Sequence, residues 1–298
     1  MGSYVPNTLE ERQEMLKEIG YSSIEDLFAH IPDEVKIKGG LNIPEGKSEL
    51  EVRREMENIA SKNQVFKIIF RGAGAYRHFI PSIVNSVISK ENLLTAYTPY
   101  QAEISQGILQ SIFEYQTMIC DLTGMDVSNA CVYDGAEAAA EAWQCARRES
   151  VRKPSYPQQS CRMQCQQSRH TAMEMEWRSW RFRKKDGVTD LDYLKENIDE
   201  QTACVYIQHP NYYGNLEDAQ AIGEIAHGAG AKYIMGVNPI SLGIIKTPAE
   251  YGADVASRRW TSHLGLPLGF GGPYLGFMAA TEDDKKASGK NCRSDRRS

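Results

Sequence analysis

The alternation of short apolar runs with amphipathic helical runs constrains the fold of this chain most. Residues 202–211 (TACVYIQHPN) have the composition of a buried strand, and residues 216–230 (LEDAQAIGEIAHGAG) form a helical pattern that ends in glycine. A second apolar run follows at 231–239 (AKYIMGVNP). Strands that alternate with helices are typical of an α/β fold with a mainly parallel sheet.

Two further segments fit this pattern upstream. Residues 130–142 (ACVYDGAEAAAEA) predict a strand, a sharp turn and an alanine-rich helix. Residues 105–123 predict a long amphipathic helix, with Gly124 as its C-cap. The side chains that this helix should bury recur at helical spacing: Ile108, Ile112, Tyr115 and Ile119.

The N-terminal part of the chain has a different character. Charged helical segments begin after Asn7 or Thr8, which can cap the first helix, and after Ser48, which can cap another. These segments offer few core positions. We therefore expect residues 1–80 to form a helical arm that wraps a neighbouring domain or subunit, and residues 81–298 to form the α/β large domain.

Composition excludes several classes of protein. A net charge of −5 argues against a nucleic-acid footprint, and no apolar run approaches the ~18 residues of a membrane span. The N-terminus lacks the apolar stretch of a signal peptide. Seven cysteines, an odd number, predict reduced thiols and a cytoplasmic location. Cys161 and Cys165 have no second pair at zinc-like spacing, so we expect no metal site.

Residues 143–183 break the pattern. They are rich in Arg, Gln and Trp and show neither strand nor helix periodicity. We interpret them as the product of a frameshift, because ordinary sequence resumes abruptly at KDGVTDLDYL. In residues 143–183 we expect exposed coil or poorly supported local structure, where the fold needs a strand and a helix. Residues 255–264 and 283–298 look like shorter slips of the same kind. The alternative is a natural divergent insertion with a basic surface.

The run YTPYQAEISQG (97–107) crowds tyrosines and polar groups around Pro99, which cannot begin a helix. This run resembles the P-protein of the glycine cleavage system, glycine dehydrogenase (decarboxylating), in the subunit 1 form of two-subunit bacterial enzymes. Three other segments share the resemblance: YDGAEAAAEA (133–142), GVNPISLGIIKTPAEYGAD (236–254) and LPLGFGGPYLGF (266–277).

The resemblance implies the fold of PLP-dependent transferases (fold type I), and a C-terminal small domain that this chain lacks. PLP chemistry needs a lysine, an acidic partner for the pyridine ring and a phosphate cradle. Asp134, Gly135 and Ala136 lie between a strand and a helix, where backbone N–H groups can cradle phosphate. An Asp134 carboxylate that caps the helix would compete for those donors. The alternative to a phosphate site is that residues 134–136 form a capped turn without a ligand.

Two other requirements of PLP chemistry are not met. Asn238 stands at the end of the 231–237 strand, where the resemblance places the acidic partner, and an amide cannot stabilise a protonated pyridine as a carboxylate does. Asn238 then serves better as a turn residue. No lysine occurs between Lys246 and Lys285. The resemblance therefore implies that PLP is carried by the partner subunit, and that this chain has no catalytic residue of its own.

The resemblance also suggests what this chain contributes to a shared site. A tyrosine supplies an apolar ring face and a hydroxyl group, and Gln and Glu side chains supply hydrogen bonds. Such groups can bind glycine or a lipoyl carrier. The alternative is that the aromatic residues belong to the core and Glu103 caps the next helix. His209 is a further candidate, or a turn residue beside proline. The candidates for the site wall are Tyr97, Thr98, Tyr100, Gln101 and Glu103.

Taken together, the resemblance implies subunit 1 of a PLP-dependent glycine decarboxylase. With subunit 2 it would decarboxylate glycine and pass the aminomethyl group to the lipoyl arm of the H-protein, while the isolated chain would be inactive. A non-catalytic interaction or regulatory subunit is the second interpretation. An inactive fragment of a disrupted gene is the third. No nucleic acid or membrane partner is expected.

Overall fold

The computed structural model describes residues 7–68, 78–94, 107–146, 153–157, 180–258, 265–266 and 274–283. The chain divides into two units, residues 1–69 and 70–298. The sequence places the end of the helical arm at residue 80, somewhat beyond this division. None of the described helices is long and apolar enough to cross a membrane.

The helices of the first unit begin with local capping interactions. The Thr8 hydroxyl accepts a hydrogen bond from the Glu11 N–H, and the Glu11 carboxylate accepts one from the Thr8 N–H. Ser48 and Glu51 form the same reciprocal pair. Among the described residues of this unit only Leu16, 8% exposed, is buried. The elements are α1 (Leu9–Glu18), the 3₁₀ helix η1 (Glu25–Phe28) and α2 (Glu49–Ala60).

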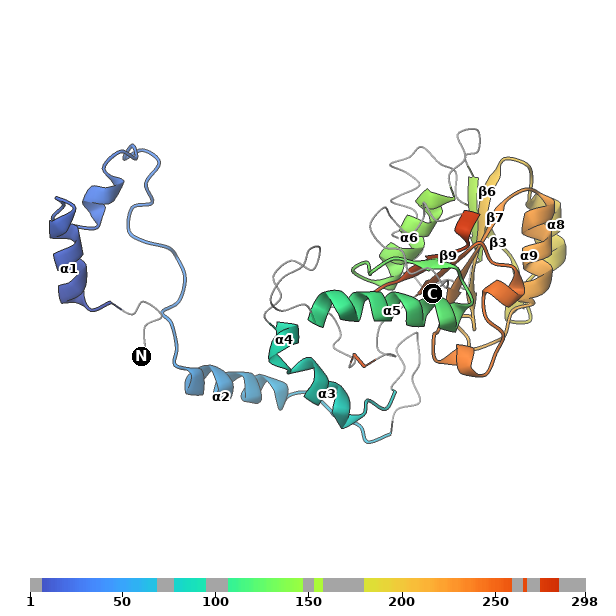
Figure 1. Cartoon of the computed structure of the whole chain (residues 1–298), viewed down its shortest axis with the longest axis horizontal. Coiled ribbons are helices and arrows are strands. Elements are labelled where there is room, and N and C mark those ends of the chain that lie inside the picture. The colour runs from blue at the N-terminus through green and yellow to red at the C-terminus, as the bar shows by residue number, and fades with distance from the viewer. Residues whose placement is uncertain are drawn as a thin grey trace. The chain divides into compact units, whose positions relative to one another are not determined.

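A seven-stranded sheet forms the centre of the second unit, in the order β1-β9-β8-β7-β6-β2-β3. Figure 1 labels β3, β6, β7 and β9 among its strands. Neighbouring strands from β3 to β8 run parallel, whereas β9 is antiparallel to both β8 and β1. The predicted mainly parallel α/β sheet is confirmed. The strands are β1 (Val127–Ser128), β2 (Lys153–Pro157), β3 (Trp180–Phe182), β6 (Thr202–His209), β7 (Lys232–Val237), β8 (Val255–Arg258) and β9 (Met278–Ala280).

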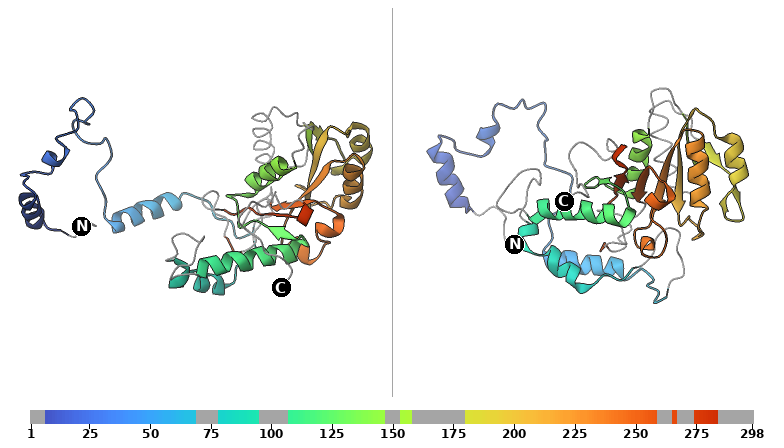
Figure 2. Two further views of the ribbon diagram at one scale, coloured as in Figure 1. Left: turned by 45° about the horizontal axis from the view of Figure 1, so that its top comes forward. Right: turned by 45° about the vertical axis from the view of Figure 1, so that its right-hand side comes forward.

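Helices cover both faces of this sheet (Figure 2). Along β6, Val205 and Ile207 pack in the core with α5, α8 and α9, whereas Cys204 and Tyr206 pack with α6 on the other face. This alternation follows from the two-residue period of a strand. The helices are α5 (Gly107–Thr123), α6 (Gly135–Cys145), α8 (Leu191–Asn197) and α9 (Ala219–Gly228).

The remaining elements of this unit are the C-cap of α5 and several short helices and strands. The predicted helix 105–123 is confirmed as α5, and Gly124 follows it with φ of 75° and donates to the Cys120 carbonyl. A two-stranded hairpin lies outside the main sheet. These elements are α3 (Ser82–Ile88), α4 (Glu91–Leu94), β4 (Lys184–Lys185), β5 (Val188–Thr189), and the 3₁₀ helices η2 (Ser241–Gly243) and η3 (Ala249–Tyr251).

The expectation of exposed coil in residues 143–183 is wrong where the segment begins, at Trp143. Residues 147–152 and 158–179 lie outside the described residues. Trp143 belongs to α6 and is 1% exposed, with its ring edge-on to Tyr206 at 6.5 Å. Trp143 follows Ala139 by one helical turn, so it continues the buried face of α6. Strands β2 and β3 also lie within this segment. β2 pairs in parallel with β6 on one side and with β3 on the other.

The second unusual segment, 255–264, begins as a regular strand. Val255 and Ala256 are buried in β8, between β7 and β9. Residues 259–264 and the tail beyond residue 283 lie outside the described residues. Whether a frameshift produced these segments stays a prediction.

Candidate functional site

The carboxyl ends of β6, β7 and β8 lie at one edge of the sheet because these strands are parallel. Strand β1 is antiparallel to β9, which is antiparallel to β8, so β1 runs in the direction of β8. The chain therefore leaves β1 toward the same edge and enters α6 there. Ligands of open α/β sheets bind at this edge.

Asp134 caps the first turn of α6. One carboxylate oxygen, Oδ1, accepts hydrogen bonds from the N–H groups of Ala136 at 2.7 Å and Glu137 at 2.9 Å. The Glu137 carboxylate in turn accepts from the Tyr133 N–H at 2.8 Å. The predicted N-cap is confirmed. Two of the donors that a phosphate would use at this helix end are therefore already bound to a carboxylate.

Gly276 holds this turn against the rest of the unit. Its N–H and carbonyl exchange hydrogen bonds of 2.8 Å with those of Val132. A Cβ on residue 276 would overlap the Asp134 carbonyl, so the backbone approach requires a glycine. The sequence motif GFGGPYLG (269–276) gave no sign of this contact, because the two segments meet only in the folded sheet.

Asn238 follows β7 and makes its hydrogen bonds within its own turn. Its side-chain oxygen accepts from the Ile240 N–H at 3.1 Å, and its carbonyl accepts from the backbone and hydroxyl of Ser241. This Asx turn leads into η2. The geometry agrees with the structural alternative for Asn238.

His209 ends β6 on the sheet face opposite α6, to judge from the alternation with Val205 and Ile207. Its side chain is 1% exposed and stands edge-on to Tyr251 at 5.4 Å. Nδ1 accepts a hydrogen bond from the Glu217 N–H at 3.2 Å. Burial lowers the pKa of His209 below its ordinary value, so the ring is neutral at neutral pH.

A buried polar network continues from His209. The Glu217 carboxylate, in a residue that is 6% exposed, accepts from the Thr189 N–H at 2.8 Å and from the Asn211 amide at 2.8 Å. Asn211 also donates to the Gly187 carbonyl at 2.9 Å. The network ties the loop after β6 to the β4–β5 hairpin. Sequence reasoning missed it, although the Asn and Gly residues of PNYYGN signal an ordered turn.

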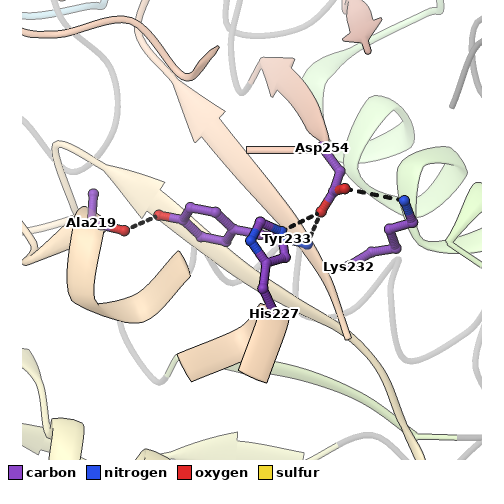
Figure 3. Close-up of polar contacts among 5 residues, drawn as sticks. All are labelled: Ala219, His227, Lys232, Tyr233 and Asp254. Carbon is purple, nitrogen blue, oxygen red and sulfur yellow. Dashed lines mark hydrogen bonds and ion pairs between the residues drawn. The ribbon is translucent and has the colours of Figure 1, made fainter. Parts of the chain in front are cut away.

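A second polar cluster lies at the other end of β7 (Figure 3). The Asp254 carboxylate accepts from His227, Lys232 and the Tyr233 N–H at 2.7–3.1 Å. Tyr233 donates its hydroxyl proton to the Ala219 carbonyl, and burial raises its pKa well above the ordinary value. The cluster joins α9 to the amino ends of β7 and β8, so its role is structural.

The remaining expectations concern metals, thiols and the site wall. No group of three or more metal-ligating side chains occurs in the described part of the chain. Burial raises the pKa of the Cys204 thiol, so this cysteine is unreactive. The predicted site wall, Tyr97, Thr98, Tyr100, Gln101 and Glu103, lies outside the described residues.

Two bacterial proteins are similar in sequence to this chain over most of its length. "Probable glycine dehydrogenase (decarboxylating) subunit 1" of Carboxydothermus hydrogenoformans is 47% identical over 295 residues, covering 94% of this chain and 64% of the relative. The protein of the same description from Halalkalibacterium halodurans is 43% identical over 282 residues, covering 94% and 63%. This chain thus spans less than two thirds of the length of these relatives.

Two solved structures also match this chain. The crystal structure of glycine decarboxylase (P-protein) of the glycine cleavage system, in inhibitor-bound form, matches with a TM-score of 0.87 and 38% identity, covering 96% of this chain and 64% of that one. A cysteine desulfurase from Thermococcus onnurineus matches with a TM-score of 0.55 and 17% identity, over 82% and 60%, which shows the fold alone. The predicted fold class, that of PLP-dependent transferases, is confirmed. A family model described as "Glycine cleavage system P-protein" matches residues 2–290, and the chain belongs to this family.

Proposed function

We propose that this chain is subunit 1 of a two-subunit glycine decarboxylase. With a second subunit that carries PLP, it decarboxylates glycine and transfers the aminomethyl group to the lipoyl arm of the H-protein in the cytoplasm. The relatives named subunit 1 support this assignment, since that name implies a partner subunit. PLP supplies an electron sink for the carbanion when bound.

The residues at the edge of the sheet where β6, β7 and β8 end do not fit PLP. The hydrogen bonds from Ala136 and Glu137 to the Asp134 carboxylate carry the argument. A phosphate at this helix end would meet a negative charge that already holds the donors. Asn238 is engaged in its own turn, and no lysine lies between Lys246 and Lys285. These observations favour a partner subunit as the carrier of PLP.

The arm supports the proposal of a partner. Three apolar side chains on α2 recur at helical spacing and are not buried by the rest of the first unit: Val52, Met56 and Ile59. Helices as short as α2 are marginal in water without packing. Burial of such a stripe stabilises an association by about 25 cal/mol per Å². A partner subunit that covers α2 accounts for these exposed residues.

One experiment tests the proposal. The purified chain is incubated with PLP, treated with borohydride and analysed by mass spectrometry, alone and after co-expression with subunit 2 of a related bacterium. We expect no trapped PLP on this chain, and glycine decarboxylation with a lipoyl carrier only in the mixture. In that mixture Glu103→Ala, in the proposed site wall, should lower turnover roughly ten- to a hundredfold while assembly persists.

The outcomes separate the interpretations. PLP trapped on this polypeptide contradicts the proposal. Assembly with subunit 2 without decarboxylation favours the non-catalytic interaction subunit instead. Failure to assemble at all favours the inactive fragment.

A further inference from the structure

The chain contains two Asp–Gly sequences, and the structure holds them in opposite ways. Asp134–Gly135 begins α6, and Asp186–Gly187 forms the turn between β4 and β5. An aspartate followed by glycine can rearrange without any enzyme, because the following residue has no side chain to shield its main-chain nitrogen. The two sites therefore provide an internal comparison of the same dipeptide.

Asp186 is free to react. The turn residues Asp186 and Gly187 have φ of 52° and 83°, and Lys185 pairs with Val188 on either side, as in a two-residue hairpin turn. Asp186 is exposed. Within the described ranges, neither its carboxylate nor the Gly187 N–H takes part in a hydrogen bond. The two reacting groups thus have no hydrogen bond to give up.

Asp134 is held by comparison. Its carboxylate accepts two backbone hydrogen bonds, and Gly135 is buried in the first turn of α6. These hydrogen bonds hold the carboxylate against the first turn of α6 and restrict the rotation of the side chain. Reaction at Asp134 would require the helix cap to open first.

We propose that Asp186 is a site of spontaneous isomerisation to isoaspartate in the folded chain. The main-chain nitrogen of Gly187 attacks Cγ of the protonated Asp186 carboxyl group. A C–N bond forms, and the nitrogen's proton and the carboxyl hydroxyl leave as water, which gives a succinimide. Water then adds at the α-carbonyl carbon and opens the ring, so that the chain continues through Cγ. No oxidant or reductant is needed, and the overall mass is unchanged.

The rearrangement would reach beyond the hairpin. IsoAsp adds one methylene to the main chain directly before Gly187, whose carbonyl accepts from the Asn211 and Asn215 amides at 2.9 and 3.2 Å. Asn211 also donates to Glu217, which contacts His209. A shifted Gly187 carbonyl therefore loosens the loop after β6, at the carboxyl edge of the sheet.

The test uses the full chain, stored for several weeks at neutral pH and physiological temperature. Isoaspartate is quantified by isoaspartyl methyltransferase labelling, and its position is assigned by electron-transfer fragmentation of peptides. We expect isoaspartate at Asp186 to accumulate several-fold faster than at Asp134. In urea, where the α6 cap is lost, the two rates should converge.

Two controls sharpen this test. Asp186→Gly removes the reacting carboxyl group and tolerates the positive φ, so labelling at the hairpin should disappear. Aged wild-type chain should also exchange the amides of residues 211–217 faster than fresh chain does, whereas the Asp186→Gly chain should not change with storage. A rate at Asp186 that does not exceed the rate at Asp134 in the folded chain overturns the proposal, and so does unchanged exchange after conversion.

Discussion

The arm and the sheet unit stabilise their helices by different means. In the arm, α1 and α2 each begin with a reciprocal cap between a hydroxyl and a glutamate, and only Leu16 is buried among its described residues. In the sheet unit, α6 and α9 place their apolar faces in two separate cores. The arm helices are therefore specified by neighbouring residues, whereas the sheet unit is specified by contacts distant in sequence.

Removing a large core side chain gives the largest effect that this comparison predicts. Trp143→Ala leaves a cavity between α6 and Tyr206, and it should lower the free energy of unfolding by about 3–5 kcal/mol. Urea unfolding followed by circular dichroism measures the change. The matched variant is Ile59→Ala in α2, where the side chain is 51% exposed, and it should change the free energy by less than about 0.5 kcal/mol. Equal effects from the two variants would contradict the comparison.

Acidification gives an effect of intermediate size. The pKa of His209 is lowered by burial, so below the unfolded-state pKa of about 6.5 the unfolded chain binds more protons than the folded chain. His209 therefore contributes stability that is fully present above about pH 6.5. This stability is lost as the pH falls toward the folded-state pKa, by up to about 1.4 kcal/mol per pH unit.

Urea midpoints measured between neutral and mildly acidic pH test this prediction. His209→Asn keeps an acceptor for the Glu217 N–H and removes the titrating ring, so the pH slope should decrease. His30→Asn, at an exposed position of the first unit, is the control and should retain the slope. A slope that both variants leave unchanged would show that His209 does not couple folding to protons.

The smallest expected effect on the sheet unit comes from a change in the arm. Ser48→Ala removes the α2 cap, at a cost of about 0.5–2 kcal/mol to that helix alone. Hydrogen exchange of residues 49–60 should accelerate, while the urea midpoint of the sheet unit stays constant. A shift of that midpoint would indicate that the two units fold together.

The sequence predicted the elements whose signals are local. Residues 202–211, 216–230 and 231–239 were assigned correctly as strand, helix and strand, because apolar runs and a closing glycine mark each of them. The Asp134 cap was predicted for the same reason, since its donors lie two and three residues away. A strand such as β2 escaped prediction because its order comes from pairing with β6.

The site was less predictable than the fold. The Glu217 carboxylate meets Thr189 across 28 positions of sequence, and Gly276 meets Asp134 only after the sheet has formed. The residue type alone does not predict such a partner. A buried glutamate and an exposed one look the same in a sequence, and so do a tightly packed glycine and an exposed one. The assignment of Tyr97, Tyr100 and Glu103 to the site wall rests on the resemblance and stays a prediction.

The pairing of β1 with β9 has a consequence for the order in which the unit assembles. Val127 lies opposite Ala280, so the edge strand of the sheet obtains its partner only from the last described strand. During synthesis the ribosome releases β1 and α6 long before that partner exists, and closing so long a loop carries an entropic cost. Contacts of such wide separation slow folding. In the nascent chain, the part of the apolar face of α6 that packs on β9 therefore has no β9 to contact until residue 280 has been translated.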